Sequence, residues 1–131
     1  MSEPAARLQR LLTEKIGECH PEDVEQRMEE IQTLALTAFR DDQLRPVFAV
    51  LGNETRYRLA RVLAVSDGEM CVCELEPVVD VSESAVSHAL SDLVEAGLVT
   101  RRKEANWRYY RTTELAESLF ETADQQVPTN E

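Results

Sequence analysis

The sequence predicts a mainly α-helical protein that carries one two-stranded β-hairpin. Apolar residues recur at helical spacing through most of the 131-residue chain. Residues 98–103 and 107–112 are typical instead of two strands around Glu104-Ala105-Asn106, where Asn106 best tolerates a left-handed backbone. The chain has 43% apolar residues, which suits an ordered core, and no apolar run near the roughly 20 residues that span a bilayer. We therefore expect a folded protein with no membrane partner.

Two helices are expected within residues 1–45. An apolar stripe runs through 4–16, and Pro21, followed by two acidic residues, is typical of a second helix start. Cys19 lies on the connection between the two helices. The apolar stripes are too large for a lone helical hairpin to bury, so we assign 1–45 to an N-terminal extension that contributes to a homodimer interface.

The next segment, 46–113, has the element order of a winged helix-turn-helix. A helix over 44–51 ends at Gly52, and Asn53 can cap the following helix. A short helix is expected over 73–79, and Ser82 caps a longer helix that Gly97 ends. The hairpin then forms the wing. A last helix over 114–123 and a loose tail complete the chain, and we assign 114–131 to the homodimer interface as well.

Double-stranded DNA is the partner that this element order predicts. In a winged helix-turn-helix, the second helix enters the major groove with its N-terminal residues, while the wing lies along the phosphates. Small hydroxyl side chains permit close approach to base edges, and arginine and lysine bind phosphates whatever the sequence. The candidate DNA-binding residues are Ser82, Ser84, Ser87 and His88 at the second helix and Arg101, Arg102, Lys103 and Arg108 in the wing.

The net charge of −11 opposes DNA binding at first sight, but the charges are unevenly distributed. Residues 67–95 contain eight acidic residues and no Lys or Arg, whereas 98–111 contain five basic residues and one acidic residue. Arg56, Arg58 and Arg61 form a second basic group. Strong salt lets like charges lie close together, because the Debye length is only ~3 Å at 1 M. We therefore expect a halophilic source, with an ordinary acidic regulator as the alternative.

Cys71 and Cys73 form a Cys-x-Cys pair, which can hold a soft metal, just before the helix-turn-helix. The start of the chain lacks the features of a secretion signal, so we expect a cytoplasmic protein with reduced thiols. Successive helical residues rotate by about 100°, so two thiols at this spacing share one metal only under two conditions. Either the helix start unwinds, or the pair precedes the helix in extended form. Binding is thus expected to distort the start of the helix that supports the DNA-reading helix.

Cys19 is the one cysteine outside this pair. One set of three cysteines cannot build the four-thiolate site that cadmium or structural zinc favours. Three thiolates in a pyramid suit arsenite or antimonite, whose lone pair fills the fourth direction. The expected inducer is therefore arsenite or antimonite on Cys71, Cys73 and Cys19, with lead or cadmium as alternatives. Cys19 could come from the same protomer or its partner, and no constitutive cofactor is expected.

From about residue 46 to 113 the chain resembles the ArsR-type metal-responsive repressors of the ArsR/SmtB superfamily. The matching segments are 47–56, Cys-Val-Cys-Glu-Leu at 71–75, Ser87-His88, 95–99 and 107–110. The resemblance implies a homodimer that represses a resistance operon and releases DNA when metal binds. Several family members also bind zinc or nickel through His and carboxylates on the last helix, but 113–131 contain no His, so we expect that site to be absent.

The chain departs from the family at three places. Ala89 stands where a second His is common, and Ala105-Asn106 stand where a wing-tip Gly is common. Glu83 begins the DNA-reading helix where many relatives have Gln, so the operator sequence cannot be transferred.

Other functions stay open beside this one. A repressor that senses oxidants through a disulfide is the nearest alternative, although Glu74 and the net acidity oppose the low thiol pKa that redox sensors need. A thiol enzyme is disfavoured because the chain has no Cys-x-x-Cys motif and no His near the pair in sequence, so no enzymatic activity is expected. The basic wing disfavours an adaptor that binds only protein.

Overall fold

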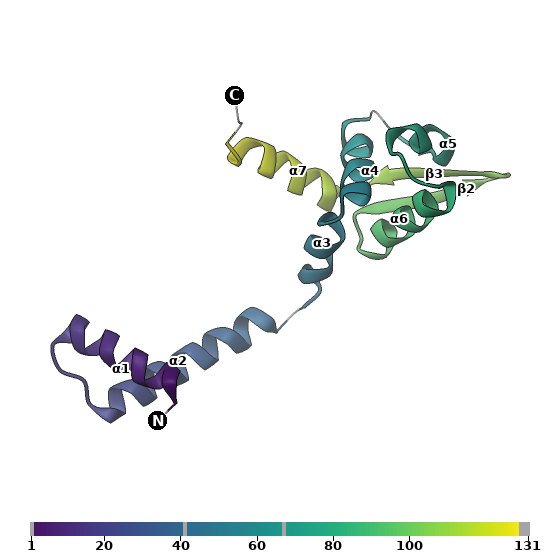
Figure 1. The fold of residues 1–131 in the computed structure, drawn as a ribbon. Helices are drawn as coiled ribbons and strands as arrows, with labels where there is room; N and C mark the ends of the chain where they lie inside the picture. The colour runs from purple at the N-terminus through teal and green to yellow at the C-terminus, as the bar shows by residue number, and fades with distance from the viewer. Residues whose placement is uncertain (1, 41, 67, 129–131) are drawn as a thin grey trace. The chain divides into compact units, whose positions relative to one another are not determined.

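The computed structural model describes residues 2–40, 42–66 and 68–128 (Figure 1). Its elements are α1 (Glu3–Ile16), α2 (Pro21–Phe39), α3 (Leu44–Leu51), α4 (Glu54–Val65), β1 (Met70–Cys71), α5 (Val72–Leu75), the 3₁₀ helix η1 (Glu76–Val78), α6 (Glu83–Glu95), β2 (Val99–Glu104), β3 (Trp107–Thr112) and α7 (Glu114–Gln126). The chain divides into two compact units between Asp42 and Gln43. The last three residues of the predicted tail lie outside the described residues. None of the helices in the described ranges is both long enough and apolar enough to cross a bilayer.

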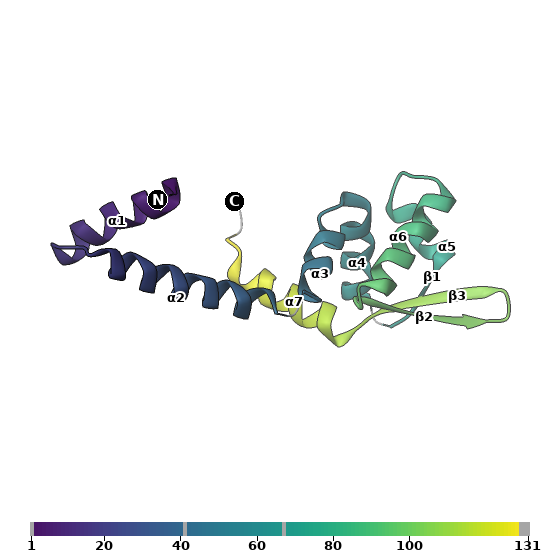
Figure 2. The ribbon, with the colours of Figure 1, turned by 90° about the horizontal axis from the view of Figure 1, so that it is seen from below.

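The N-terminal unit is a helical hairpin in which α1 lies back along α2 (Figures 1 and 2). Gly17 ends α1 with φ 80°, and its N–H donates to the Thr13 carbonyl at 2.9 Å. Pro21 begins α2, as predicted. In these two helices only Val24 is buried. Leu36 and Phe39 are 75% and 76% exposed, so a single chain leaves an apolar surface uncovered.

The C-terminal unit encloses one apolar core, formed by α3, α4, α6, α7 and the inner face of a small sheet. Its fully buried large side chains are Leu59, Leu63, Leu75, Val86, Leu90, Leu93, Leu98, Val99 and Tyr110. The predicted helix starts are confirmed: Asn53 Oδ1 accepts from the Arg56 N–H at 3.0 Å, and Ser82 Oγ accepts from the Ala85 N–H at 3.1 Å. These caps fix where α4 and α6 begin and so position the helix-turn-helix.

The predicted hairpin is confirmed as β2 and β3, and the sheet has a third strand that was not predicted, in the order β1-β3-β2. The added strand β1 contains only two residues, and Met70 and Cys71 pair with Tyr110 and Tyr109 of β3. A strand of two residues is too short to show the alternation by which a sequence predicts strands. It forms here because its residues pair with the edge of β3. The helix expected over 73–79 also differs, because α5 ends at Leu75 and Pro77, which lacks an N–H, lies in the 3₁₀ helix that follows.

The tip of the wing is a two-residue turn, since Glu104 pairs with Trp107 across Ala105-Asn106. Ala105 has a φ of 54°, and it is the one non-glycine residue with positive φ in the described ranges. The left-handed residue was predicted at Asn106, so the prediction is wrong by one position. The physical reason is the strand register, because in a tight hairpin the first turn residue can be the one that must take positive φ. Nothing in the local sequence reveals that register.

Candidate functional site

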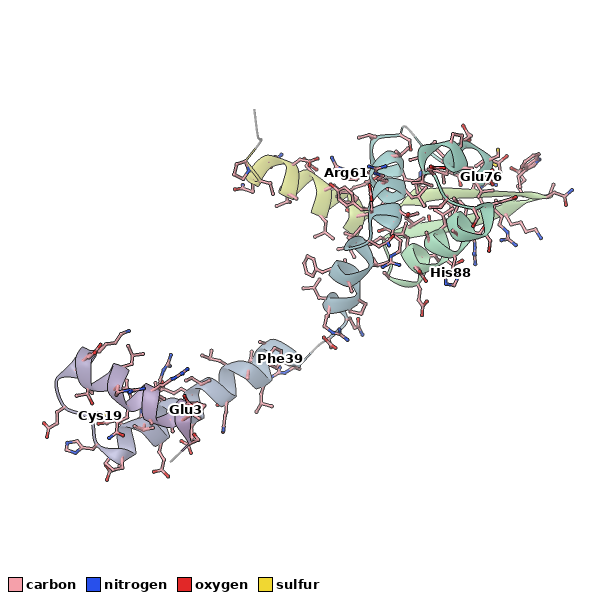
Figure 3. All side chains as sticks on the ribbon, viewed as in Figure 1. Glu3, Cys19, Phe39, Arg61, Glu76 and His88 are labelled. Carbon is pink, nitrogen blue, oxygen red and sulfur yellow. The ribbon has the colours of Figure 1, made fainter. Side chains whose placement is uncertain are left out.

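Helix α6 exposes a polar surface over its N-terminal half. Ser82, Ser84 and His88 are exposed, Ser87 is half-buried, and His88 lies on the outer side of the helix (Figure 3). The opposite side of α6 is buried in the core through Val86, Ala89, Leu90 and Leu93. Ser82 has a structural task as well, because its hydroxyl caps the helix. Helix α6 can therefore enter a groove of DNA and bring these short polar side chains close to the base edges.

The register of β2 and β3 divides the wing into two faces of different chemistry. Alternate residues of a strand point to opposite faces, so the paired Arg101↔Tyr110 and Lys103↔Arg108 share one face. Tyr110 is buried in the core to which α6 also contributes its apolar side, and α6 packs against β2. The cations Arg101, Lys103 and Arg108 therefore lie on the same side of the sheet as α6. All three are exposed, and within the described residues none of them makes an ion pair.

Arg102 lies on the other face of the wing and is held by the protein itself. Its Nε and Nη2 donate to the two oxygens of Glu69, each at 3.0 Å, and its Nη1 donates to Glu104 at 3.2 Å. Its guanidinium also lies 4.8 Å from the centre of the Tyr109 ring. The Arg102 hydrogen bonds lower the pKa of Glu69, and the two carboxylates raise the pKa of Arg102 above its ordinary value. Arg102 thus differs from the three free cations with which it was predicted.

Glu69 and Tyr109 were missed by the sequence analysis. In the sequence Glu69 stands only two residues before Cys71, and nothing in that position links it to the wing. Only the pairing of β1 with β3 brings Glu69 to Arg102, 33 residues away along the chain.

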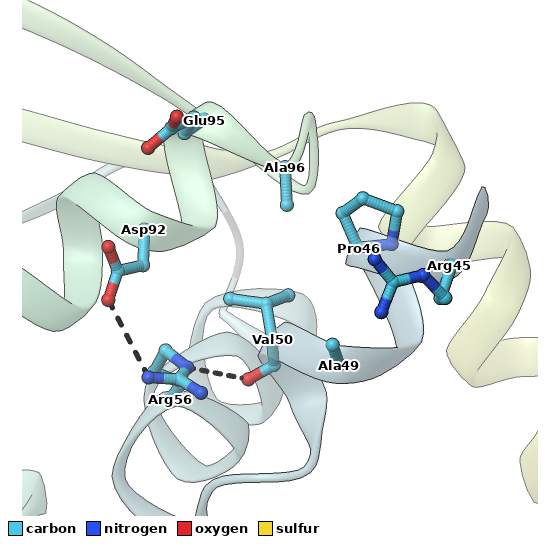
Figure 4. A pocket seen from close by; sticks show the side chains of 8 residues that line it. All are labelled: Arg45, Pro46, Ala49, Val50, Arg56, Asp92, Glu95 and Ala96. Atoms are coloured by element: carbon cyan, nitrogen blue, oxygen red, sulfur yellow. Dashed lines mark hydrogen bonds and ion pairs between the residues drawn. The ribbon is translucent and has the colours of Figure 1, made fainter. Parts of the chain in front are cut away.

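The second basic group of the sequence analysis is neutralised in the structure. Arg56 pairs with Asp92 at 3.6 Å, Arg58 with Glu54 at 2.7 Å and Arg61 with Asp124 at 3.1 Å. Arg56 Nε also donates to the Val50 carbonyl at 2.7 Å, beside an open cleft of about 400 Å³ between α3 and α6 (Figure 4). Arg56 and Arg61 join α4 to neighbouring helices, whereas the Arg58 pair lies within α4. The free cations Arg101, Lys103 and Arg108 of the wing are therefore the better candidates for phosphate contacts.

Cys71 and Cys73 bring their sulfur atoms to 3.0 Å from each other. Cys71 ends β1 with an extended backbone (φ −73°, ψ 150°), and Cys73 lies in the first turn of α5. The expected conflict of two thiols on one regular helix therefore does not arise, and no unwinding is needed to bring the sulfurs together. Of the two conditions stated for a shared metal, the structure is nearer to the second, because Cys71 is extended and precedes α5. The reason is the strand-to-helix junction, which lies between the two cysteines.

The two thiols have different surroundings. Cys71 is only 6% exposed, whereas Cys73 is exposed and donates its S–H to Cys71 Sγ. The Cys71 N–H donates to Glu74 Oε1 at 2.9 Å, which fixes that carboxylate beside the pair. The hydrogen bond to Cys71 is the main cause that raises the pKa of Cys73, and the negative charge of Glu74 adds to it. The raised pKa disfavours the thiolate form of Cys73, which is the form that a redox sensor needs.

Cys19 belongs to the N-terminal unit, on the connection between α1 and α2 (Figure 3). It is half-buried, and its thiol lies 3.6 Å from the carbonyl oxygen of His20. In the part of the chain that the structure describes, no three His, Cys, Asp or Glu side chains are grouped so that they could hold a metal ion. The thiol pair thus supplies two donors, and neither unit by itself adds a third.

Fold and site together define a class, the winged helix-turn-helix DNA-binding regulators. A family model described as bacterial regulatory protein, arsR family, matches residues 54–101. A putative arsenical resistance operon repressor from Halobacterium salinarum is 48% identical over 116 residues, which cover 87% of this chain and 90% of that protein. A second putative repressor of this kind from the same organism is 59% identical over 78 residues, covering 60% of this chain and 66% of its own. The chain therefore belongs to the ArsR family.

Solved structures agree with this assignment. A homodimeric winged helix-turn-helix DNA-binding domain from Mycobacterium bovis, described as a possible ArsR-family transcriptional regulator, superimposes with a TM-score of 0.60. It is 28% identical and covers 69% of this chain and 82% of its own. The similar proteins are DNA-binding regulators rather than enzymes. The source of the relatives, Halobacterium salinarum, also agrees with the halophilic origin expected from the charge distribution.

Proposed function

We propose that this protein is a cytoplasmic, homodimeric repressor that leaves its operator DNA when arsenite or antimonite binds Cys71 and Cys73. The observation that carries the proposal is the 3.0 Å separation of the two sulfurs, in the same unit as α6 and the wing. The names of the Halobacterium salinarum relatives support an arsenical inducer. The proposal thus joins a two-thiol site and a DNA-binding surface in one compact unit.

The DNA-binding half of the proposal uses the surface shared by α6 and the wing. Ser84, Ser87 and His88 are proposed to meet base edges, because they line the exposed side of α6. Arg101, Lys103 and Arg108 are proposed to meet phosphates, and Ser82 to cap the helix and contribute its exposed hydroxyl. Arg102 would reach a phosphate only after breaking its ion pairs with Glu69 and Glu104.

The sensing half is a ligand exchange without oxidation. Arsenite in neutral water is As(OH)₃, and each incoming thiol forms one As–S bond while one As–O bond breaks. The thiol proton leaves with the displaced hydroxide as water, so protonated thiols such as Cys73 are suitable reactants. Two thiols leave one hydroxyl on arsenic, and we propose that Cys19, from either protomer, displaces it. Lead or cadmium could use the same sulfurs, but each would release protons on binding.

A thiol-redox repressor is the second candidate, since two sulfurs at 3.0 Å could join as a disulfide on oxidation. The raised pKa of Cys73 counts against it, because oxidants attack the thiolate. Titration with peroxide separates this candidate from the first.

The test is operator binding by the parent protein, titrated in turn with arsenite, antimonite, cadmium, lead and peroxide. Cys71→Ser and Cys73→Ser should bind DNA as the parent does but fail to respond to arsenite. Cys19→Ser should respond weakly, and X-ray absorption should then show two sulfur neighbours of arsenic rather than three. Release of Cys71→Ser and Cys73→Ser by arsenite as readily as the parent would remove the sensing assignment and leave only DNA binding.

A further inference from the structure

We infer that Glu69, Tyr109 and Arg102 connect the thiol pair to the wing, and that Glu69 is a positioning residue through which occupation of the thiols alters the wing. This inference rests on the proposed function, because it describes how the same thiol site regulates DNA binding. It goes beyond that function by naming the residues that carry the signal. None of the three is a thiol or one of the free cations proposed to meet phosphates.

The first support is a row of residues across the sheet. Cys71 of β1 pairs with Tyr109 of β3, and Tyr109 pairs with Arg102 of β2. Paired residues of neighbouring strands share a face, so these three side chains lie in one row from the buried thiol to the wing. Within that row, the guanidinium of Arg102 lies over the Tyr109 ring and contacts it.

The second support is the ion pair between Glu69 and Arg102, which also connects the β1 side of the sheet to the wing. Glu69 precedes β1 directly and holds Arg102 with both carboxylate oxygens, each at 3.0 Å. Two parallel hydrogen bonds fix the orientation of the guanidinium as well as its position. Glu104 also binds Arg102, but it lies two residues further along the same strand, so that contact stays within the wing. Glu69 therefore supplies the ionic contact from the β1 side to the wing.

The third support is that a bound metal cannot leave the sulfurs where they are. Two thiolates on a tetrahedral metal such as zinc, at about 2.3 Å each, lie about 3.8 Å apart, and a pyramidal arsenic, with narrower angles between its bonds, separates them by less. In the free protein they are 3.0 Å apart and joined by the S–H of Cys73. Binding therefore removes that hydrogen bond and moves the sulfurs apart. Cys71 is buried and paired to Tyr109, so its displacement is transmitted to β1 and to the adjoining Glu69.

The result at the wing is a change in the part of the hairpin that carries the DNA contacts. Arg101 and Lys103 flank Arg102 in β2, so a shift of Arg102 along the row changes where these two cations point. Because Arg101 and Lys103 face the α6 side, even a small rotation of β2 alters their distance from the phosphates that α6 brings into reach. The thiol site can in this way weaken DNA binding without any unwinding of α5.

The chain contains its own reporter for this connection. Trp107 is the only tryptophan, lies at the start of β3 near the wing tip and is 54% exposed. Its emission should therefore change when arsenite or cadmium binds the thiols, in the full-length protein and without DNA. Glu69→Gln removes the charge of the link but keeps the size of the side chain. Glu104→Gln is the matched control, because it makes the same change at the other carboxylate on Arg102.

The expected result is a Trp107 response to arsenite and to cadmium in the parent and in Glu104→Gln, and a loss of most of it in Glu69→Gln. Titration of the thiols should show equal metal binding in all three. The factor by which arsenite raises the DNA dissociation constant, ordinarily about 5–150-fold for such a switch, should fall by at least about threefold in Glu69→Gln only.

Three results would overturn the link: Glu69→Gln responding as the parent does, Glu69→Gln and Glu104→Gln losing the response equally, or no Trp107 response in the parent when cadmium occupies the thiols. The proposed function fails in a different way. If arsenite does not release DNA from the parent while Trp107 still responds to cadmium, the link holds and the arsenite-sensing assignment is wrong.

Discussion

At the scale of single residues, the thiol pair combines a buried acceptor with an exposed donor. Cys71 is buried and accepts the S–H of Cys73, and Glu74 is fixed next to both by the Cys71 N–H. This arrangement raises the pKa of Cys73 and so disfavours its thiolate, the form that oxidants attack. The Cys71 acceptor, more than the general acidity of the chain, is responsible.

We predict that Cys71→Ala lowers the pKa of Cys73, because the substitution removes the acceptor that stabilises its protonated form. Alkylation by iodoacetamide follows the thiolate, so in the parent its rate at Cys73 should rise with pH through a midpoint above that of an ordinary cysteine, roughly 8.5. In Cys71→Ala the midpoint should move to lower pH, as read by mass spectrometry. Cys19→Ala serves as the control, with an unchanged midpoint at Cys73. A midpoint that stays put or rises in Cys71→Ala contradicts the assigned hydrogen bond.

The second prediction at this scale concerns Ala105. An L-residue with positive φ is strained by about 1–2 kcal/mol, whereas glycine accepts that backbone but gains disorder in the unfolded chain. Ala105→Gly should therefore raise the free energy of unfolding by about 0.5–1 kcal/mol, measured by denaturant titration. Asn106→Gly, at a position without positive φ, should bring no gain. Equal effects of the two substitutions would argue against strain at Ala105.

At the scale of elements, the wing joins two tasks on its two faces. The face toward α6 carries the free cations Arg101, Lys103 and Arg108, and the opposite face carries Arg102 with its two carboxylates. The cations on the first face are proposed to meet phosphates, whereas the ion pairs on the second hold Arg102 in place. A net charge of −11 is compatible with DNA binding, because binding depends on the few cations that face the phosphates and not on the charge of the whole chain.

Arg101→Glu should weaken binding to operator and random DNA alike, because Arg101 is proposed to meet a phosphate rather than a base. Measured against salt concentration, the slope of log affinity should become shallower by about 1. Arg111→Glu makes the same charge change in the same hairpin but on the face away from α6, since Arg111 pairs with Thr100. It should affect binding much less. If both variants weaken binding equally, net charge and not the face of the wing governs affinity.

At the scale of the whole molecule, apolar surface remains uncovered on a single chain. Leu36 and Phe39 of α2 and Leu115 of α7 are exposed, in the two segments assigned to the homodimer interface. A two-fold axis that buries these surfaces would also set two recognition helices one DNA turn apart, about 34 Å. The apolar surface and the expected operator geometry therefore both support the proposed dimer.

Sedimentation at micromolar concentration in high salt should show a dimer. Replacing Leu36 and Phe39 together by Gln should raise the dimer dissociation constant by at least about tenfold, because each buried apolar side chain contributes roughly 1 kcal/mol or more. Val65→Gln is the control, since Val65 is 78% exposed but belongs to α4. A monomeric parent would contradict the assembly, and an equal loss in Val65→Gln would contradict the role of α2.

Much of the fold could be predicted because it is encoded locally. The helix starts at Asn53 and Ser82, the end of α6 near Gly97 and the strands on either side of the wing tip each depend on residues within one turn or one strand of themselves. The candidate residues of α6 and the wing followed from that order of elements. The two faces of the wing did not, because which residues pair across a hairpin is decided by its register.

What the sequence by itself determined is the order and type of the main elements, the cationic wing and the presence of two thiols one residue apart. Only the tertiary structure decided that β1 pairs with β3, that the sulfurs of Cys71 and Cys73 meet across a strand-to-helix junction, and that Arg102 is held by Glu69. The physical reason is range. Caps, turns and alternation depend on neighbours in the chain, whereas a two-residue strand and an ion pair across 33 residues form only once the core has brought distant segments together.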